Sequence, residues 1–179
     1  MGEFLKENRE RIIEGYKKTA EKFPDLLKEI SGKIESLDVD TALAMKYLYM
    51  TMPFSDIGNY SFESYLDYAG NGVSLWKEYE AVRNLPELLF LNYVLYHRVN
   101  EEEIAPCRKL FRSEISSFIK ENGEAGILEE GDRKACAIEI NYWCAQEATY
   151  HCTDDRTLSA LAVYRRGNGR CGEESVFTV

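Results

Sequence analysis

The chain has 179 residues, of which 45% are hydrophobic and 30% are charged, values that exclude a disordered chain and a membrane protein. Its formal net charge of −9 disfavours binding to the phosphates of nucleic acids. No stretch approaches the roughly 18 apolar residues of a membrane span, and the charged N-terminus lacks the apolar core of a signal peptide. We therefore predict a cytoplasmic protein that binds neither nucleic acid nor membrane, with earlier removal of a signal peptide left open.

Hydrophobic residues recur with helical spacing along almost the whole chain, which predicts an all-α fold of about seven to nine helices. Pro24 and Pro53 should stop the first and third of them. No segment shows the alternation with a period of two residues that is typical of a strand. The predicted helices span residues 3–23, 26–34, 41–52, 62–69, 86–97, 107–122, 133–150 and 156–166, and a last helix begins at Cys171.

Short polar residues and glycines mark several of the predicted helix ends. Asp40 or Thr41 should cap the third helix, and Ser61 should cap the fourth, which residues 70–72 (Gly-Asn-Gly) should break. Gly167 should end the helix before Cys171. In the helix over 133–150, Ala135, Ile138, Tyr142, Ala145 and either Ala148 or Thr149 form one face.

Cysteine and histidine limit the possible chemistry. The chain has five cysteines without a CxxC pair and only two histidines, His97 and His151. This spacing fits neither a zinc site nor a disulfide framework, so we predict reduced thiols, no bound metal and no cofactor. The cysteines are Cys107, Cys136, Cys144, Cys152 and Cys171.

The C-terminal segment RGNGRCGEESVFTV contains the strongest candidate for a reactive residue. Gly167 and Gly169 tolerate a positive φ, so the chain can turn sharply and place Cys171 at the start of a helix. There the helix dipole and the unpaired backbone N–H groups favour a thiolate. The N–H group of Cys171 can also help to hold an oxyanion. The alternative is that Cys171 is a small buried hydrophobic residue, as many cysteines are.

Charged neighbours act on Cys171 in opposite directions. Arg170 adds a cation that favours the thiolate, whereas Glu173 and Glu174 oppose it if they point inward. These residues alone leave the two interpretations of Cys171 about equally supported.

The same segment resembles the nucleophile segment of bacterial transglutaminase-like proteins, which belong to the papain-like Cys-His-Asp superfamily. Its GRCGE core is also similar to that of peptide N-glycanases. The preceding ATYHCTDDRTLSALAVYRRG resembles the segment before the nucleophile, and the resemblance extends back to about Met52. It implies that Cys171 is the nucleophile. It further implies that residues 1–130 form an N-terminal helical region and residues 131–179 the helical half of a papain-like α+β domain whose sheet is missing.

The resemblance also suggests residues around the nucleophile. Arg170, Gly172, Trp143 and Asp154 are candidates for the oxyanion site or the rim of the cleft. Trp143 has a second interpretation as a core residue, because it lies on a helix with Cys136 and Cys144, which we expect to be inert buried thiols. Asp154, with the adjacent Asp155 and Arg156, also reads as a helix cap with a surface ion pair.

The base and the orienting acid of this family follow the cysteine in the sequence, and no residue after Cys171 can fill these positions. His151 precedes Cys171, in the wrong order, and should be a solvent-facing residue at a helix end. His97 should be a structural hydrogen-bonding residue. The acidic run 101–103 is expected to be a solvated loop.

Two functions of different classes follow. In the first, the chain is a fragment of a cysteine acyltransferase or amide hydrolase, inactive alone, whose substrate is a protein or peptide amide that reacts through a thioester. In the second, it is a non-catalytic helical interaction module. Val176, Phe177 and Val179 should either mediate self-association through the C-terminus or tuck the last helix against the helices before it.

Overall fold

The computed structural model describes residues 3–122, 133–152 and 157–178. The chain divides into two compact units, Met1–His97 and Arg98–Val179, which we describe separately. The resemblance had placed a division after residue 130. In the structure, the helices on both sides of that position belong to the second unit. Among the helices of the described ranges, none has the length and apolar character needed to cross a bilayer.

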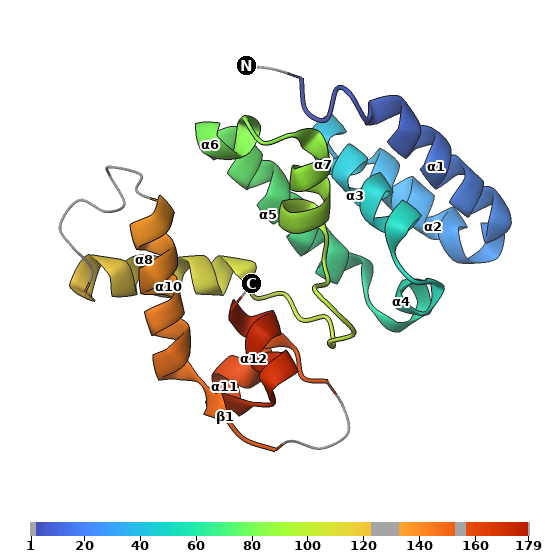
Figure 1. Cartoon of the computed structure of the whole chain (residues 1–179). Helices are drawn as coiled ribbons and strands as arrows, with labels where there is room; N and C mark the ends of the chain where they lie inside the picture. Colours follow the sequence, from blue (N-terminus) through green and yellow to red (C-terminus); the bar gives the residue numbers. More distant parts are fainter. Residues whose placement is uncertain (1–2, 123–132, 153–156, 179) are drawn as a thin grey trace. The chain divides into compact units, whose positions relative to one another are not determined.

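Unit 1 (Met1–His97) is a bundle of helices around α3 (Figure 1). Helix α3 packs against α1, α2 and α5, and its buried side chains include Ala44, Met45 and Leu48. The elements are α1 (Arg9–Lys22), α2 (Pro24–Glu35), α3 (Val39–Thr51), α4 (Phe54–Asn59), α5 (Phe62–Glu78), α6 (Glu80–Arg83), α7 (Glu87–Leu89) and a π-helix η1 (Phe90–Leu95).

Within the described part of unit 2 (Arg98–Val179), the chain forms four helices and one pair of very short strands. Helix α10 packs against α8 and α12, and α12 packs against α11 and both strands. The elements are α8 (Arg108–Asn122), α10 (Arg133–Glu147), β1 (Thr149–Tyr150), α11 (Ala160–Arg166), β2 (Asn168–Gly169) and α12 (Cys171–Thr178). Figure 1 shows β1 beside α11 and α12.

The mostly helical fold is as predicted, but several local predictions were wrong. The described residues form eleven α-helices rather than seven to nine, because α4 and α6 are too short to produce a periodic pattern. Asp38 rather than Asp40 or Thr41 caps α3, since its carboxylate accepts a hydrogen bond from the Thr41 N–H. Ser61 caps α5 as predicted.

Helix α5 continues through residues 70–72, where the sequence predicted a break. A Cβ atom at Gly72 would lie 2.9 Å from Cδ1 of Leu95, so this glycine allows η1 to approach α5 closely. Asn71 is buried beside it. Packing between the two helices therefore outweighs the helix-breaking tendency of glycine, which is only about 1 kcal/mol.

Two short strands were also missed, because two residues are too few to show alternation. Strand β1 pairs in parallel with β2, with Thr149 opposite Asn168 and Tyr150 opposite Gly169. As a result α10 ends at Glu147 rather than at residue 150. Helix α11 begins after its cap Ser159, later than predicted.

The buried face of α10 is largely different from the face that the sequence pattern singled out. Ile138, Tyr142 and Ala145 are exposed, and the buried side chains are Trp143, Cys144 and Ala148. Trp143 and Cys144 pack with Val163 and Phe177 in the core of unit 2. The last helix thus lies against α10, as predicted, and its Val176 and Phe177 are buried within the chain. This is the tucked arrangement of the two that the sequence allowed.

Candidate functional site

Cys171 is the first residue of α12, and its side chain is exposed. The structure therefore places it at a helix N-terminus, as predicted, and excludes the alternative of a small buried hydrophobic residue. Ser175 donates a hydrogen bond to the carbonyl oxygen of Cys171 at 2.8 Å, which reinforces the first turn. Because this sulfur is accessible to solvent, it can attack an electrophilic carbon of an incoming molecule.

The two glycines before Cys171 have different roles. Gly167 has φ 67° and ends α11, and its N–H donates to the carbonyl of Val163, which closes the helix. Gly169, which would tolerate a positive φ, does not adopt one. A Cβ atom at Gly169 would instead lie 3.2 Å from Cβ of Glu173 and 3.3 Å from a methyl group of Val163. Gly169 is therefore needed for close packing beneath the turn.

Glu173 fixes the turn that carries Cys171. Its carboxylate accepts hydrogen bonds from the backbone N–H of Leu158 at 2.9 Å and of Arg170 at 2.8 Å. The same carboxylate binds the guanidinium of Arg170 at 2.9 Å. Glu173 is only 1% exposed. Because it occupies the third position of α12, this contact is a capping interaction that also ties α12 to the segment before α11.

The Arg170–Glu173 pair changes the roles predicted from the sequence. Glu173 points inward, but the Arg170 cation compensates its charge. The Arg170 guanidinium is also a structural group of the turn, because it binds Glu173. The backbone N–H groups of Cys171 and Gly172 are further candidates for holding an oxyanion. A Cβ atom at Gly172 would meet nothing within 4 Å, so the space over this residue is open.

Trp143 is a core residue, and the prediction that it lines the rim was wrong. It is 3% exposed and its ring lies 5.3 Å from Phe177 and 5.8 Å from Phe111. These aromatic rings support α12 from below. Asp154, the other predicted rim residue, lies outside the described residues, together with Asp155 and Arg156.

Strand β1 and the residues that follow it bring Tyr150, His151 and Cys152 next to the turn before Cys171. The N–H of His151 donates to the carbonyl of Gly169 at 2.9 Å, which extends the pairing of β1 and β2 by one residue. The Tyr150 hydroxyl lies 3.8 Å from the sulfur of Cys152, and both side chains are exposed. Sequence reasoning missed the Tyr150–Cys152 pair, because its proximity to Cys171 depends on a strand pairing across 19 residues of sequence.

His151 is exposed, as predicted, and its Nδ1 atom lies 2.7 Å from the carbonyl oxygen of Cys152. His151 directly follows β1 in the chain. The pairing thus brings its backbone to the turn that carries Cys171.

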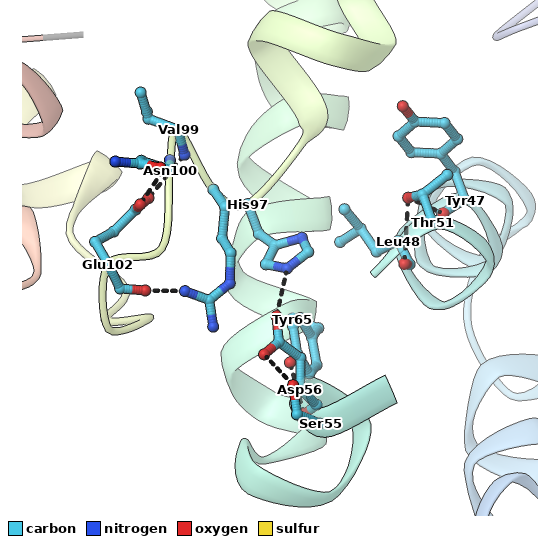
Figure 2. A network of polar contacts seen from close by, with 11 residues as sticks. Tyr47, Leu48, Thr51, Ser55, Asp56, Tyr65, His97, Val99, Asn100 and Glu102 are labelled. Atoms are coloured by element: carbon cyan, nitrogen blue, oxygen red, sulfur yellow. Dashed lines mark hydrogen bonds and ion pairs between the residues drawn. The ribbon is translucent and has the colours of Figure 1, made fainter. Parts of the chain in front are cut away.

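His97, in unit 1, is buried and structural, as predicted. Its Nε2 atom lies 3.4 Å from the carboxylate of Asp56, and both side chains are almost fully buried (Figure 2). Tyr65 packs its ring edge against His97 and donates a hydrogen bond to the carbonyl of Asp56. The pair therefore belongs to the core of unit 1, where solvent and substrate do not reach the imidazole.

The acidic run 101–103 contains one buried residue, contrary to the predicted solvated loop. Glu102 is 5% exposed, and its carboxylate accepts hydrogen bonds from the N–H groups of Val99 and Asn100, both at 2.7 Å (Figure 2). Arg98 donates to the backbone carbonyl of Glu102. Glu102 therefore closes a turn at the beginning of unit 2, and only its neighbours Glu101 and Glu103 face solvent.

Within the described ranges, no three metal-ligating side chains converge on one point. Comparison of the chain with protein-family models, with curated proteins and with solved structures finds no match. The resemblance to transglutaminase-like proteins consequently depends on the residues of the Cys171 segment, and the activity it implies is a matter of proposal.

Proposed function

We propose that Cys171 is the nucleophile of transglutaminase-like acyl transfer on the amide group of a protein or peptide. The observation that carries this proposal is the exposed cysteine at the first position of α12, on a turn held by the buried Glu173 carboxylate. A rigid turn, an accessible sulfur and a helix start that favours negative charge are the features that thiol catalysis requires.

The reaction would proceed through a thioester. The Cys171 sulfur attacks the amide carbonyl carbon, and the backbone N–H groups at the start of α12 stabilise the oxyanion. The C–N bond breaks as the leaving amine takes up a proton, and an amine or water then attacks the thioester. These outcomes correspond to transamidation, deamidation or hydrolysis.

The proposal includes a base and an orienting acid that the described residues do not supply at Cys171. His97 is buried with Asp56, and the imidazole of His151 contacts the carbonyl oxygen of Cys152. We therefore expect these 179 residues alone to cleave amides poorly, since acid–base assistance contributes about 10²–10⁴ in rate. An acyl donor whose leaving group needs no proton should bypass this requirement.

Acylation by a p-nitrophenyl ester of an N-blocked glutamine tests the nucleophile directly. Intact-mass and peptide analysis should locate one acyl group on Cys171, and Cys171→Ser should abolish it. Cys152→Ser is the matched control, because Cys152 is also exposed but does not begin a helix. Acylation of Cys152 at the same rate as Cys171, or of neither, would contradict the proposal and favour the helical interaction module.

A further inference from the structure

Two exposed cysteines lie at the ends of the two paired strands. Strands β1 and β2 run in parallel with Tyr150 opposite Gly169. Cys152 lies two residues after Tyr150, and Cys171 lies two residues after Gly169. The bond from the His151 N–H to the Gly169 carbonyl continues the pairing toward them. This bond is the last of the ladder, and Cys152 and Cys171 each lie two residues beyond the paired positions, on the two segments that leave it.

The Tyr150 side chain interacts with both cysteines. Residues two apart on a strand share a face, so Cys152 lies on the side of Tyr150, as their contact of 3.8 Å shows. The hydrogen bond with Cys152 and the charge of that thiol raise the pKa of the Tyr150 phenol, and the charge of Cys171 adds to this effect. The Tyr150 phenol therefore interacts electrostatically with both sulfur atoms.

The spacing at the end of the ladder is compatible with a disulfide. Neighbouring strands lie about 4.7–4.9 Å apart, and the Cα atoms of a disulfide are separated by about 4.4–6.8 Å, so the two segments need to diverge little beyond the bond between His151 and Gly169. The remaining cysteines of the chain are elsewhere: Cys144 is buried in the core of unit 2, Cys136 lies within α10, and Cys107 is buried before α8. Cys152 and Cys171 are both exposed, which lets an oxidant reach them.

We propose that Cys152 and Cys171 form a reversible disulfide when the chain meets a hydroperoxide. This inference rests on the strand register and the exposure of both thiols, and it holds whether or not Cys171 transfers acyl groups. If Cys171 is the nucleophile, the disulfide blocks it, and Cys152 becomes the residue that protects it from irreversible oxidation.

The chemistry balances with the hydroperoxide as the only oxidant. The Cys171 sulfur attacks the outer peroxide oxygen, so an S–O bond forms, the O–O bond breaks, and the released alkoxide leaves as an alcohol after protonation by the thiol proton. The Cys152 sulfur then attacks the Cys171 sulfenic acid, the S–S bond forms, and the S–O bond breaks with release of water. Two thiols lose two electrons, and a dithiol reductant restores them by exchange.

Peptide mapping after oxidation by hydrogen peroxide tests this pairing. Cleavage after Glu147 and Arg156 isolates Cys152 in a peptide over 148–156, separate from Cys144, and cleavage after Arg170 releases Cys171 in a short C-terminal peptide. We expect the non-reduced digest to contain these two peptides joined, and dithiothreitol to separate them. Cys152→Ser should lose the joined species and accumulate a dimedone adduct on Cys171, whereas Cys136→Ser should behave as the wild-type chain.

The inference fails if the oxidised wild-type chain carries Cys171 only as a dimedone adduct or a sulfinic acid. It also fails if Cys171 is joined to a cysteine other than Cys152, or to a second chain in a gel band that intensifies with protein concentration. Acylation of Cys171 by the activated ester is measured on the reduced chain. A missing disulfide would therefore leave the proposed nucleophile intact, and a missing acylation would leave the disulfide intact.

Discussion

Replacing Glu173 by glutamine should loosen the turn that carries Cys171. The Glu173 carboxylate accepts two backbone hydrogen bonds and one from the Arg170 guanidinium, at 2.8–2.9 Å, while 1% exposed. Glutamine has nearly the same shape but presents an NH₂ group to donors on one side. At least one buried N–H then faces another donor, and the Arg170 cation loses its counter-charge.

The magnitude follows from these contacts. A hydrogen bond to a charged group contributes about 1.5–3 kcal/mol, and removal of one partner of a buried ion pair costs about 3–5 kcal/mol. The Arg170 side chain is 36% exposed, so water recovers part of the loss. We therefore expect the free energy of unfolding of unit 2 to fall by about 3 kcal/mol in Glu173→Gln.

Urea denaturation followed by Trp fluorescence measures this loss in the required unit. The chain has two tryptophans, Trp76 in unit 1 and Trp143 in the core of unit 2. In a Trp76→Phe background the fluorescence reports unit 2 alone. Glu174→Gln is the matched control, because Glu174 lies on the same turn but is only half-buried. A Glu173→Gln value within about 0.5 kcal/mol of that control would refute the reasoning.

Three further perturbations have defined outcomes. Gly169→Ala should destabilise unit 2 by about 1–3 kcal/mol through overpacking. Gly172→Ala, with open space around it, should instead stabilise α12 by about 0.5–1 kcal/mol. Equal urea midpoints for the two variants would contradict this. Burial raises the pKa of the Cys144 thiol, so iodoacetamide at pH 8 should label Cys144 more slowly than Cys152 by peptide mass analysis. Hydrogen bonds to Thr41 lower the pKa of Asp38, so the Asp38 carboxylate should stabilise unit 1 at neutral pH and lose this effect as pH falls through the lowered pKa. The melting temperatures of Asp38→Ala and the wild-type chain should therefore converge in acid. A difference that stays constant with pH would contradict this role of Asp38.

Local backbone chemistry was readable from the sequence. Phe23 and Met52 end α1 and α3 immediately before Pro24 and Pro53, because proline cannot continue a helix. Gly167 ends α11 because it adopts the left-handed conformation. The position of Cys171 at a helix start follows from the same local reasoning, as does the helical class of the chain.

Contacts between distant residues were not readable in this way. Glu87 accepts hydrogen bonds from the N–H groups of Glu7 and Asn8, and Glu173 accepts one from Leu158. A glutamate looks the same in the sequence whether its carboxylate is buried or solvated. Neither the contacts of Glu87 and Glu173 nor the burial of Glu102 therefore produces a sequence pattern.

Packing decided the remaining features of the site. By itself, the sequence determined which of the longer segments become helices and that a cysteine begins the last one, because these depend on residues within one or two turns. The tertiary structure decided that α5 runs through residues 70–72, that Trp143 lies under α12, and that β1 lies beside β2. The last of these puts Cys152 and Cys171 on the two segments that leave the paired strands. A pairing of two residues with two others leaves no periodic signal, and its stability comes from the helices packed around it.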